Sequence, residues 1–539
     1  MPNITRYLGS FVCVIALAIS SCNRQSPSQT KAPASPEAPQ NGSVSSAISC
    51  GELAKLNLPT TTITAADDIA AGTFVPPPGA FGPPAPPGAP PPYAGLPSFC
   101  RVAGTITPAP GSEIRFEVWL PKTWNGRFVG IGNGGTAGFI FYPDMAGPLT
   151  RGYAVAGTDT GHSGGLADWS FVGHREKLID YGYRAIHEMT AKSKAVVEAY
   201  YRTAAKQSYW NGCSAGGRQG LVEANRFPED YEAIIARAPA NNPPVQGVRE
   251  VLVQQATTDR IEPLTPDKLK LVTEAAIAAC DAADGVRDRT VTDPMACTFD
   301  PGVLACKARD QPDCLTARQV ARVRQIYRGV EDPSSGAQIF PRMLPTSEVD
   351  WVPPPFVSEV AAIGTNYFRQ VVFRDSKWDP FQLDLGADVA RARTADGGSI
   401  AMTDADLHAF VRRGGKLLLW HGWSDGSIPP HNTINYYNDV MSTLGSGQPE
   451  DQVRLFMAPG VQHCGGGEGA WQVDFLAIIE DWVQRGKAPE RVVASRPLEG
   501  GGSRSRPLCS YPQVAAYTGQ GSSDEAGSFV CMSPPSSSR

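Results

Sequence analysis

The feature that most constrains the fold is a small-residue turn, Gly212-Cys213-Ser214-Ala215-Gly216, placed between two regular segments. Residues 208–212 before it are typical of a strand, and residues 216–226 after it are typical of a helix. Gly-x-Ser-x-Gly at a strand-to-helix turn indicates a nucleophile elbow, because the glycines let the backbone pass tightly beneath an exposed serine. Glycine-rich turns are common in a chain with 55 glycines, so the placement of the motif carries more weight than the motif.

Strand-like and helix-like segments alternate on both sides of this turn. Apolar or alternating stretches predict strands at 114–120, 127–131, 153–158, 231–236, 416–420 and 454–458. A 3.6-residue period predicts helices at 177–204 and 471–485. Such alternation implies right-handed crossovers and a mostly parallel sheet covered on both faces, which is an α/β fold.

A long interruption divides this pattern into two parts of one core. Residues 241–409 contain four cysteines, many prolines and an aspartate-rich stretch, and we expect them to form a lid domain over one end of the sheet. The core then comprises residues 50–240 and 410–539. Its first part begins with an arm, expected to be irregular, in which a Pro/Gly-rich segment (75–92) lies between Cys50 and Cys100.

The N-terminus has the pattern of an export signal. Arg6 precedes a short apolar run (11–19), and Ile19-Ser20-Ser21-Cys22 resembles a bacterial lipoprotein cleavage box, with Cys22 as the lipidated residue. An ordinary secretory signal cut nearby is the alternative. Residues 1–22 are therefore predicted to be a signal peptide and residues 23–49 a disordered tether. We expect a secreted protein or an outer-membrane or periplasmic lipoprotein, in which a lipid at Cys22 is the only membrane contact.

Charge and cysteine content narrow the function further. A net charge of -5 with no Lys/Arg run argues against a nucleic-acid partner and favours a small molecule. Of the twelve cysteines, Cys13 and Cys22 lie in the signal, and an even number in an oxidising compartment implies disulfides. Spacing does not give the connectivity. The even number of cysteines nevertheless argues against a free, reactive Cys213 beside Ser214.

A serine nucleophile needs a base, and the base needs an acid to orient it. Behind an elbow the expected order along the chain is serine, acid, histidine, with each residue following a strand. Asp425 follows the strand at 416–420, and His463 follows the strand at 454–458. Asp439 is a competing acid, although it lies in a helix-like run. We expect the remaining histidines to serve packing or surface roles, or to shape the site near Asp425: His162, His174, His187, His408, His421 and His431.

Two backbone N–H groups should face the oxyanion that forms during attack. One is that of Ala215, directly after the serine. The other is expected from the glycine cluster that follows the strand at 127–131, where the residues leave four candidates open: Gly130, Gly132, Gly134 and Gly135. A simple tight turn would show the same composition.

The aspartate-rich stretch suggests a cation site. Asp281, Asp284 and Asp288 surround Gly285 at a spacing that can wrap a hard cation such as Ca²⁺, with backbone carbonyls completing the shell. The spacing is not that of an EF-hand, and a solvated acidic turn is the alternative. Cys280 and Cys297 flank the stretch, which favours a preformed loop.

Together these motifs resemble the tannase and feruloyl esterase family, which has the α/β-hydrolase fold with a large inserted lid and includes the bacterial mono(hydroxyethyl) terephthalate hydrolases. The resemblance extends from about Cys50 to Cys531 and rests on the elbow, the aspartate-rich loop, His421-Gly422-Trp423-Ser424-Asp425 and His463-Cys464. It implies a Ser214–His463–Asp425 triad and an oxyanion hole formed by Gly135 and Ala215.

The same resemblance implies a structural calcium and five disulfides. The calcium ligands would be the side chains of Asp281, Asp284 and Asp288 and the carbonyls of Val286 and Thr290. The disulfide pairs would be Cys50–Cys100, Cys213–Cys464, Cys280–Cys297, Cys306–Cys314 and Cys509–Cys531.

The implied reaction is hydrolysis of esters of aromatic acids through an acyl-enzyme. Terephthalate hydrolases have a longer aromatic lid segment with an arginine for the distal carboxylate, whereas this chain has residues 364–373, in which Arg369 is the candidate. A hydroxycinnamoyl or galloyl ester is therefore favoured over a terephthalate monoester. A serine peptidase of the same fold and a non-catalytic, calcium-dependent binding protein are the competing hypotheses.

Overall fold

The computed structural model describes residues 48–78, 80, 92–136, 138–353 and 355–534. The predicted signal peptide, Cys22 and nearly all of the predicted tether lie outside these residues, as does most of the Pro/Gly-rich segment in the N-terminal arm. No helix in the described part of the chain is both long enough and apolar enough to cross a membrane.

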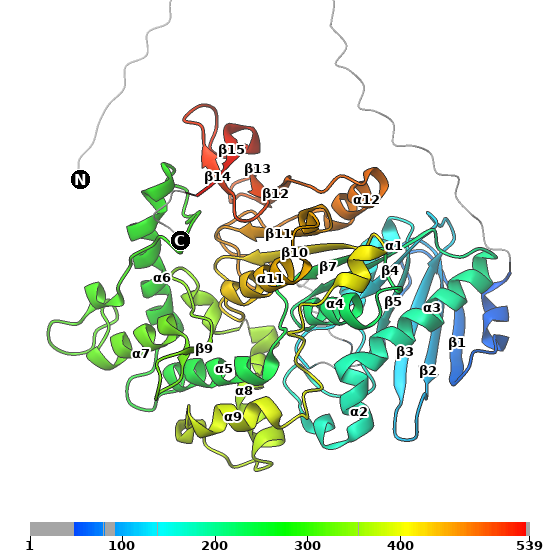
Figure 1. The fold of residues 1–539 in the computed structure, drawn as a ribbon, viewed down its shortest axis with the longest axis horizontal. Coiled ribbons are helices and arrows are strands. Elements are labelled where there is room, and N and C mark those ends of the chain that lie inside the picture. Colours follow the sequence, from blue (N-terminus) through cyan, green and yellow to red (C-terminus); the bar gives the residue numbers. More distant parts are fainter. Residues whose placement is uncertain (1–47, 79, 81–91, 137, 354, 535–539) are drawn as a thin grey trace, which may run out of the picture. The chain divides into compact units, whose positions relative to one another are not determined.

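A nine-stranded sheet organises the described residues (Figure 1). Its strand order is β1-β2-β3-β5-β4-β6-β7-β10-β11, and the last six strands run parallel to their neighbours. Three antiparallel pairings join β1, β2, β3 and β5 at the other edge. The strands are β1 (Thr61–Ile69), β2 (Phe99–Ile106), β3 (Ile114–Pro121), β4 (Arg127–Ile131), β5 (Ala154–Thr158), β6 (Gln207–Cys213), β7 (Ala233–Arg237), β10 (Lys416–Gly422) and β11 (Val453–Ala458). The mostly parallel α/β sheet is thereby confirmed.

Helices cover both faces of this sheet. Alternate residues of β10 show the arrangement: Leu417 and Leu419 pack in one apolar core, and Leu418 and Trp420 pack in the other. The first core is closed by α3 (Ala185–Tyr201), α4 (Ala215–Arg226) and α11 (Pro430–Leu444), and the second by α1 (Tyr142–Thr150) and α12 (Phe475–Arg485). Because both faces are buried, the parallel strands are nearly continuous apolar runs.

Most predicted elements occur within about two residues of their expected ends. The helix expected from residue 471 begins at Phe475, because the Asp474 side chain accepts a hydrogen bond from Ala477 N at 3.0 Å and caps it. The helix expected at 177–204 consists of α2 (Arg175–Ile179), one π-helical turn and α3.

The expectation of a wholly irregular N-terminal arm is wrong for β1. Residues Thr61–Ile69 pair with β2 in antiparallel register, with Asp67 opposite Arg101. The strand lies at the sheet edge and is half exposed, so it needs no apolar periodicity. Its polar sequence therefore carries no strand signal for an analysis based on buried positions.

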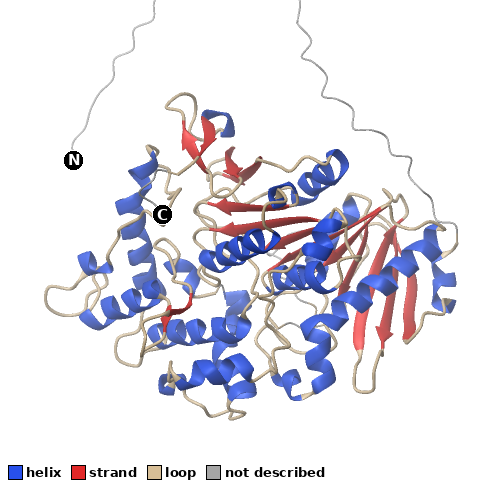
Figure 2. Ribbon diagram, in the orientation of Figure 1, coloured by secondary structure: helices blue, strands red, loops and turns tan. Residues whose placement is uncertain are grey.

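Residues 241–409 form a mostly helical segment between β7 and β10 (Figure 2). It packs around its own apolar cluster, which includes Val253, Leu269, Val323 and Trp351. Its elements are α5 (Pro243–Thr257), α6 (Pro266–Cys280), α7 (Ala317–Arg328), β8 (Val330–Glu331), β9 (Gln338–Phe340), α8 (Ile363–Tyr367) and α9 (Ala387–Thr394), with α10 (His408–Arg412) at its end. We call this segment the lid.

Two hairpins and five disulfides complete the described chain. The hairpins are β12 (Arg491–Pro497) with β13 (Ser503–Cys509) and β14 (Val514–Tyr517) with β15 (Phe529–Met532). The disulfides are the five pairs that the resemblance implies: Cys50–Cys100, Cys213–Cys464, Cys280–Cys297, Cys306–Cys314 and Cys509–Cys531.

Candidate active site

Ser214 occupies a strained turn between β6 and α4. Its backbone has φ 61° and ψ −120°, which is a left-handed conformation that a non-glycine residue rarely adopts. A Cβ atom on Gly212 would lie 2.3 Å from the Gly216 carbonyl oxygen, so a side chain at that position would clash. Ser214 N donates to Arg237 O at 2.9 Å, and Ser214 O accepts from Ala240 N at 3.0 Å. The turn is therefore fixed by close backbone packing, as expected of a nucleophile elbow.

Asp425 and His463 are in direct contact. Asp425 follows β10, His463 follows β11, and His463 Nδ1 lies 2.7 Å from Asp425 Oδ2. The second oxygen of Asp425 accepts hydrogen bonds from Ser427 N at 2.8 Å and Ile428 N at 2.7 Å. Asp425 is fully buried, whereas Asp439, the competing acid, is exposed on α11.

His421 also contacts the acid, as expected of a residue that shapes the site. Its Nε2 lies 3.1 Å from Asp425 Oδ2 and 3.0 Å from Ile428 O, and its Nδ1 lies 2.7 Å from Thr433 Oγ1. The ring is fully buried. Two imidazoles thus share one carboxylate oxygen, and only that of His463 is part-exposed.

Electrostatics keep Asp425 ionised. Burial alone would raise the pKa of Asp425, but the charge and hydrogen bonds of His463 and His421 hold it below its usual value. Burial alone would lower the pKa of His463, but Asp425, as negative neighbour and hydrogen-bond partner, holds it above its usual value. The pair therefore has the charge distribution of a histidine base oriented by a buried acid.

A cavity of about 610 Å³ brings Ser214 and His463 together. The Cys213–Cys464 disulfide joins the residues beside them, with a Cα–Cα distance of 6.0 Å. The bond links two loops 251 residues apart in the chain. It fixes the elbow relative to the histidine loop.

The glycine loop after β4 lies against the elbow. Gly216 N donates to Asn133 O at 2.7 Å, and Asn133 N donates to Gln219 Oε1 at 2.9 Å. Gly135 lines the cavity at φ +56°, where an added Cβ would lie 2.3 Å from Leu166 O. Of the four glycines left open by the sequence, Gly132, Gly134 and Gly135 line the cavity together with Ala215. Gly130 does not line it and packs in β4 beneath Tyr231.

The rest of the cavity wall combines aromatic and charged side chains. The aromatic part includes Phe141, Trp169, Tyr181 and Tyr367, three of which belong to one apolar cluster with the lid. Its charged members are Asp144, Arg218, Arg237, Glu250 and Asp350, none of which the sequence analysis identified. Arg369, the candidate for a distal carboxylate, does not line the cavity, and its Nε donates to Trp378 O at 2.9 Å.

The aspartate-rich loop lies in the lid, away from this cavity lining. Asp284 Oδ1 accepts from Val286 N at 2.9 Å, Asp281 Oδ1 from Asp288 N at 3.3 Å, and Asp288 Oδ1 from Thr290 N at 3.0 Å. The other oxygen of Asp288 pairs with Arg506. Burial raises the pKa of Asp284, and the negative Asp288 and Asp281 raise it further.

These residues fit a hard cation in kind. All the candidate ligand atoms are oxygens, and the pKa of Asp284 stays raised although Arg504 and Arg506 both pair with Asp288. Within the described residues, however, no group of three or more His, Cys, Asp or Glu side chains is arranged to hold a metal ion. The three carboxylates would have to turn from their backbone donors to close around one.

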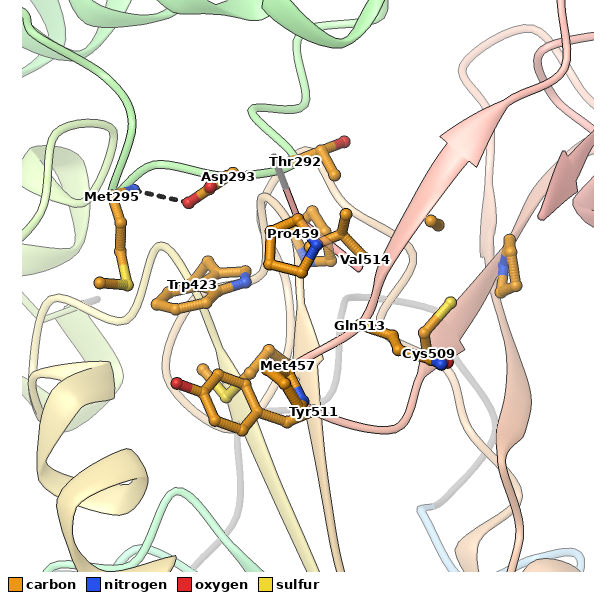
Figure 3. Close-up of a pocket in the computed structure, with 14 residues that line it drawn as sticks. Thr292, Asp293, Met295, Trp423, Met457, Pro459, Cys509, Tyr511, Gln513 and Val514 are labelled. Atoms are coloured by element: carbon orange, nitrogen blue, oxygen red, sulfur yellow. Dashed lines mark hydrogen bonds between the residues drawn. The ribbon is translucent and has the colours of Figure 1, made fainter. Parts of the chain in front are cut away.

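A second, mostly apolar cavity of about 260 Å³ lies beside Trp423, two residues before Asp425 (Figure 3). Trp423, Met457 and Tyr511 lie on one side of it, and Thr292 and Asp293 border it from the lid. Asp293 accepts a hydrogen bond from Met295 N at 3.0 Å. This cavity contains neither Ser214 nor His463, so the larger cavity is the candidate active site.

Comparison with known proteins gives consistent matches. The family model "Tannase and feruloyl esterase" matches residues 100–532. An uncharacterized esterase from Xanthomonas campestris pv. campestris is 36% identical over 543 residues, covering 91% of this chain and 92% of that protein. A protein named probable feruloyl esterase B-2 from Aspergillus terreus is 32% identical over 464 residues, covering 80% and 86%. The crystal structure of feruloyl esterase B from Aspergillus oryzae superposes with a TM-score of 0.79 at 28% identity, covering 90% of this chain and 99% of that chain.

Proposed function

The chain belongs to the tannase and feruloyl esterase family of carboxylic ester hydrolases, and from that premise we propose that it cleaves esters of aromatic acids through a Ser214–His463–Asp425 triad. The observation that carries this proposal is the contact of His463 with the buried Asp425 at the wall of the cavity that contains Ser214. The chain order, serine then acid then histidine, is that of this fold.

In this mechanism His463 accepts the proton of Ser214 as Oγ attacks the ester carbonyl carbon. Asp425 holds the imidazole through Nδ1 and stabilises the imidazolium. The N–H groups of Ala215 and Gly135 stabilise the oxyanion of the tetrahedral intermediate. His463 then gives the proton to the departing alkoxide, which leaves the acyl group on Ser214. Water, deprotonated by His463, hydrolyses this acyl-enzyme and regenerates the serine.

The acid part of the substrate is proposed to be a feruloyl, hydroxycinnamoyl or galloyl group. The aromatic wall formed by Phe141, Trp169, Tyr181 and Tyr367 supports a flat ring next to the serine. Arg369, the candidate for the distal carboxylate of a terephthalate monoester, is bonded to Trp378 O and does not line the cavity. Such a substrate would therefore need Arg218 or Arg237 instead.

Calcium is proposed to stabilise the aspartate loop of the lid. The side chains of Asp281, Asp284 and Asp288 and the carbonyls of Val286 and Thr290 would hold it. The bound ion would supply positive charge to a carboxylate cluster that repels itself, so its role would be structural. No step of ester cleavage passes through it.

Export is supported by the five disulfides, since such bonds persist in oxidising compartments. We propose a signal peptide at residues 1–22 and lipidation of Cys22. Mass spectrometry of the mature N-terminus would test both, because a lipidated Cys22 and a processed secretory signal give different masses.

The activity test uses purified protein with methyl ferulate, methyl gallate, mono(hydroxyethyl) terephthalate and a peptide amide. We expect turnover of the first two and loss of that turnover in Ser214→Ala. Equal rates in Ser214→Ala, or cleavage of the amide alone, would contradict the proposal.

A further inference from the structure

The lid supplies a half-buried carboxylate, that of Asp350, to the backbone of both loops that hold the acid and the base. Asp350 lies in a short 3₁₀ turn, Glu348–Trp351. A single oxygen of Asp350, Oδ2, accepts hydrogen bonds from Gly426 N at 2.8 Å and from His463 N at 3.0 Å. One lid atom therefore bridges the residue after Asp425 and the proposed base.

The acid loop (residues 422–428) meets the lid at further points. Arg249 on α5 donates to Gly426 O at 3.0 Å and also to Ser427 O. Ser424 Oγ lies 2.8 Å from Thr346 Oγ1. A Cβ on Gly426 would lie 2.5 Å from the backbone carbon of Asp350, so the contact requires glycine. The lid is thus packed directly on the loop that carries Asp425.

The charges around Asp350 link its pKa to that of the proposed base, His463. Burial, followed by the negative charge of Asp425, raises the pKa of Asp350 to about 7, while His463 opposes that rise. The guanidinium of Arg249 faces both Asp425 and Asp350, and Glu250 lies beside Arg249 on the same helix. In return, the negative charge of Asp350 helps to raise the pKa of His463. Asp350 and His463 are therefore coupled both by a hydrogen bond and by charge.

We propose that Asp350 is a positioning residue of the triad, which fixes the backbone of His463 relative to Asp425 and makes a docked lid a condition for a correctly placed base. This inference rests on the proposed function. Asp350 does not touch the reacting atoms in this scheme. It acts through two backbone N–H groups and through its charge.

The test compares Asp350→Ala and Asp350→Asn with Glu348→Gln, each in the full chain. Glu348 is a matched control because it is a fully buried carboxylate in the same turn that bonds to Thr273 Oγ1 at 2.8 Å and Thr346 N at 3.1 Å, and to neither His463 nor Gly426. The measurements are kcat and KM for methyl ferulate across pH, together with Tm.

Asp350→Ala removes both hydrogen bonds, so we expect kcat to fall by about tenfold to a hundredfold with KM nearly unchanged, as a small displacement of a catalytic group produces. Asn can accept the same two hydrogen bonds, so Asp350→Asn should restore most of kcat. Both variants lose the negative charge that favours protonated His463. The acid limb of kcat/KM should therefore move to lower pH in both, and Glu348→Gln should move only Tm.

A purely structural role would lower Tm in all three variants while leaving kcat and the acid limb at their wild-type values, and this result would overturn the inference. If Asp350→Ala does not fold, the pH of the acid limb of kcat/KM in Asp350→Asn decides between the two roles. A wild-type protein without ester turnover would instead contradict the proposed function. In that event, NMR titration of ¹⁵N-labelled histidines still tests the inference, because an unchanged His463 pKa in Asp350→Asn would refute it.

Discussion

Two loops of this molecule, the acid loop and the aspartate loop, each hold a carboxylate at least partly away from water, but they shift its pKa in opposite directions. In the acid loop, Asp425 has two backbone N–H donors and contacts with His421 and His463, and its pKa is held low. In the aspartate loop, Asp284 has one backbone donor and the hydroxyl of Thr292, and its pKa is raised. Asp425 is fully buried and Asp284 is half-buried, yet the more buried side chain has the lower pKa, so the difference comes from their neighbours.

The opposite pKa shifts show that the carboxylate of the acid loop has its positive partners within the protein, whereas that of the aspartate loop does not. Asp425 is more buried than Asp284, yet donors and imidazoles outweigh its desolvation. Asp284 faces Asp288 and Asp281, while Arg504 and Arg506 both pair with Asp288. The acid loop therefore has its positive partner in His463, whereas the aspartate loop would gain one from a cation.

The largest expected effect comes from removing the charge of Asp425 in the acid loop. Asp425→Asn keeps the size of the side chain but cannot hold the His463 tautomer or stabilise an imidazolium, so kcat should fall by about 10⁴-fold. Steady-state kinetics on methyl ferulate would measure this loss. Asp439→Asn is the matched control, because Asp439 is exposed on α11. If the two variants lost activity equally, Asp425 would not be the acid.

A second prediction concerns the disulfide beside each loop. Cys213–Cys464 closes 251 residues and joins the elbow to the histidine loop, whereas Cys280–Cys297 closes 17 residues around the aspartate loop. The chain-entropy model gives about 5.5 and about 3 kcal/mol of unfolding free energy for these loops. Replacing both cysteines of the first pair by serine should lower kcat by about tenfold or more, because small displacements of catalytic groups are costly.

Replacing the second pair should lower Tm and leave kcat almost unchanged. Kinetics and thermal melts on the two double variants would decide between these outcomes. If replacing Cys213 and Cys464 also changed only Tm, their bond would stabilise the fold without affecting the geometry of the site.

The sequence predicts the parts of the site that follow local rules. The elbow, the acid and the base each directly follow an apolar strand, and β6, β10 and β11 are recognisable because both faces of the sheet are buried. The mostly parallel sheet follows from the same alternation. β1 is not predicted because it is a half-exposed edge strand whose paired residues lie 30 to 45 positions away in the chain.

The site residues that the sequence does not predict are placed there by contacts between segments far apart in the chain. Asp350 lies in a proline-rich part of the lid, and nothing in its neighbours along the chain indicates that it bonds to His463 N 113 residues away. Arg249 resembles any other arginine on an amphipathic helix until α5 is placed on the acid loop. No local pattern distinguishes the glycines of the loop after β4, whereas the structure separates Gly130 from the three that line the cavity.

Removing calcium tests the second half of the comparison. At a free concentration of about a hundred times its Kd, a bound ion stabilises the folded state by about 3 kcal/mol. A chelator should therefore lower Tm and leave kcat of the folded enzyme nearly unchanged. Asp284→Asn should lose most of this chelator response, whereas Asp293→Asn, beside the loop, should keep it. A wild-type Tm that does not respond to chelator would identify the loop as an acidic turn only.

The smallest expected effect is the pH dependence of the calcium-free protein. Because the pKa of Asp284 is raised in the folded state, this residue favours folding when protonated, and that contribution is lost as pH rises through the folded pKa. In chelator, Tm should therefore fall as pH rises from the ordinary aspartate range, and Asp284→Asn should flatten the fall. The proposed calcium would bind the ionised loop, so the Tm gained on adding it should grow over the same pH range. The sign of the Asp284→Asn effect should thus reverse, from stabilising in chelator at neutral pH to destabilising in calcium. A variant that lowered Tm equally in both conditions would show that the raised pKa reflects burial alone, and the contrast between the two loops would then need no cation.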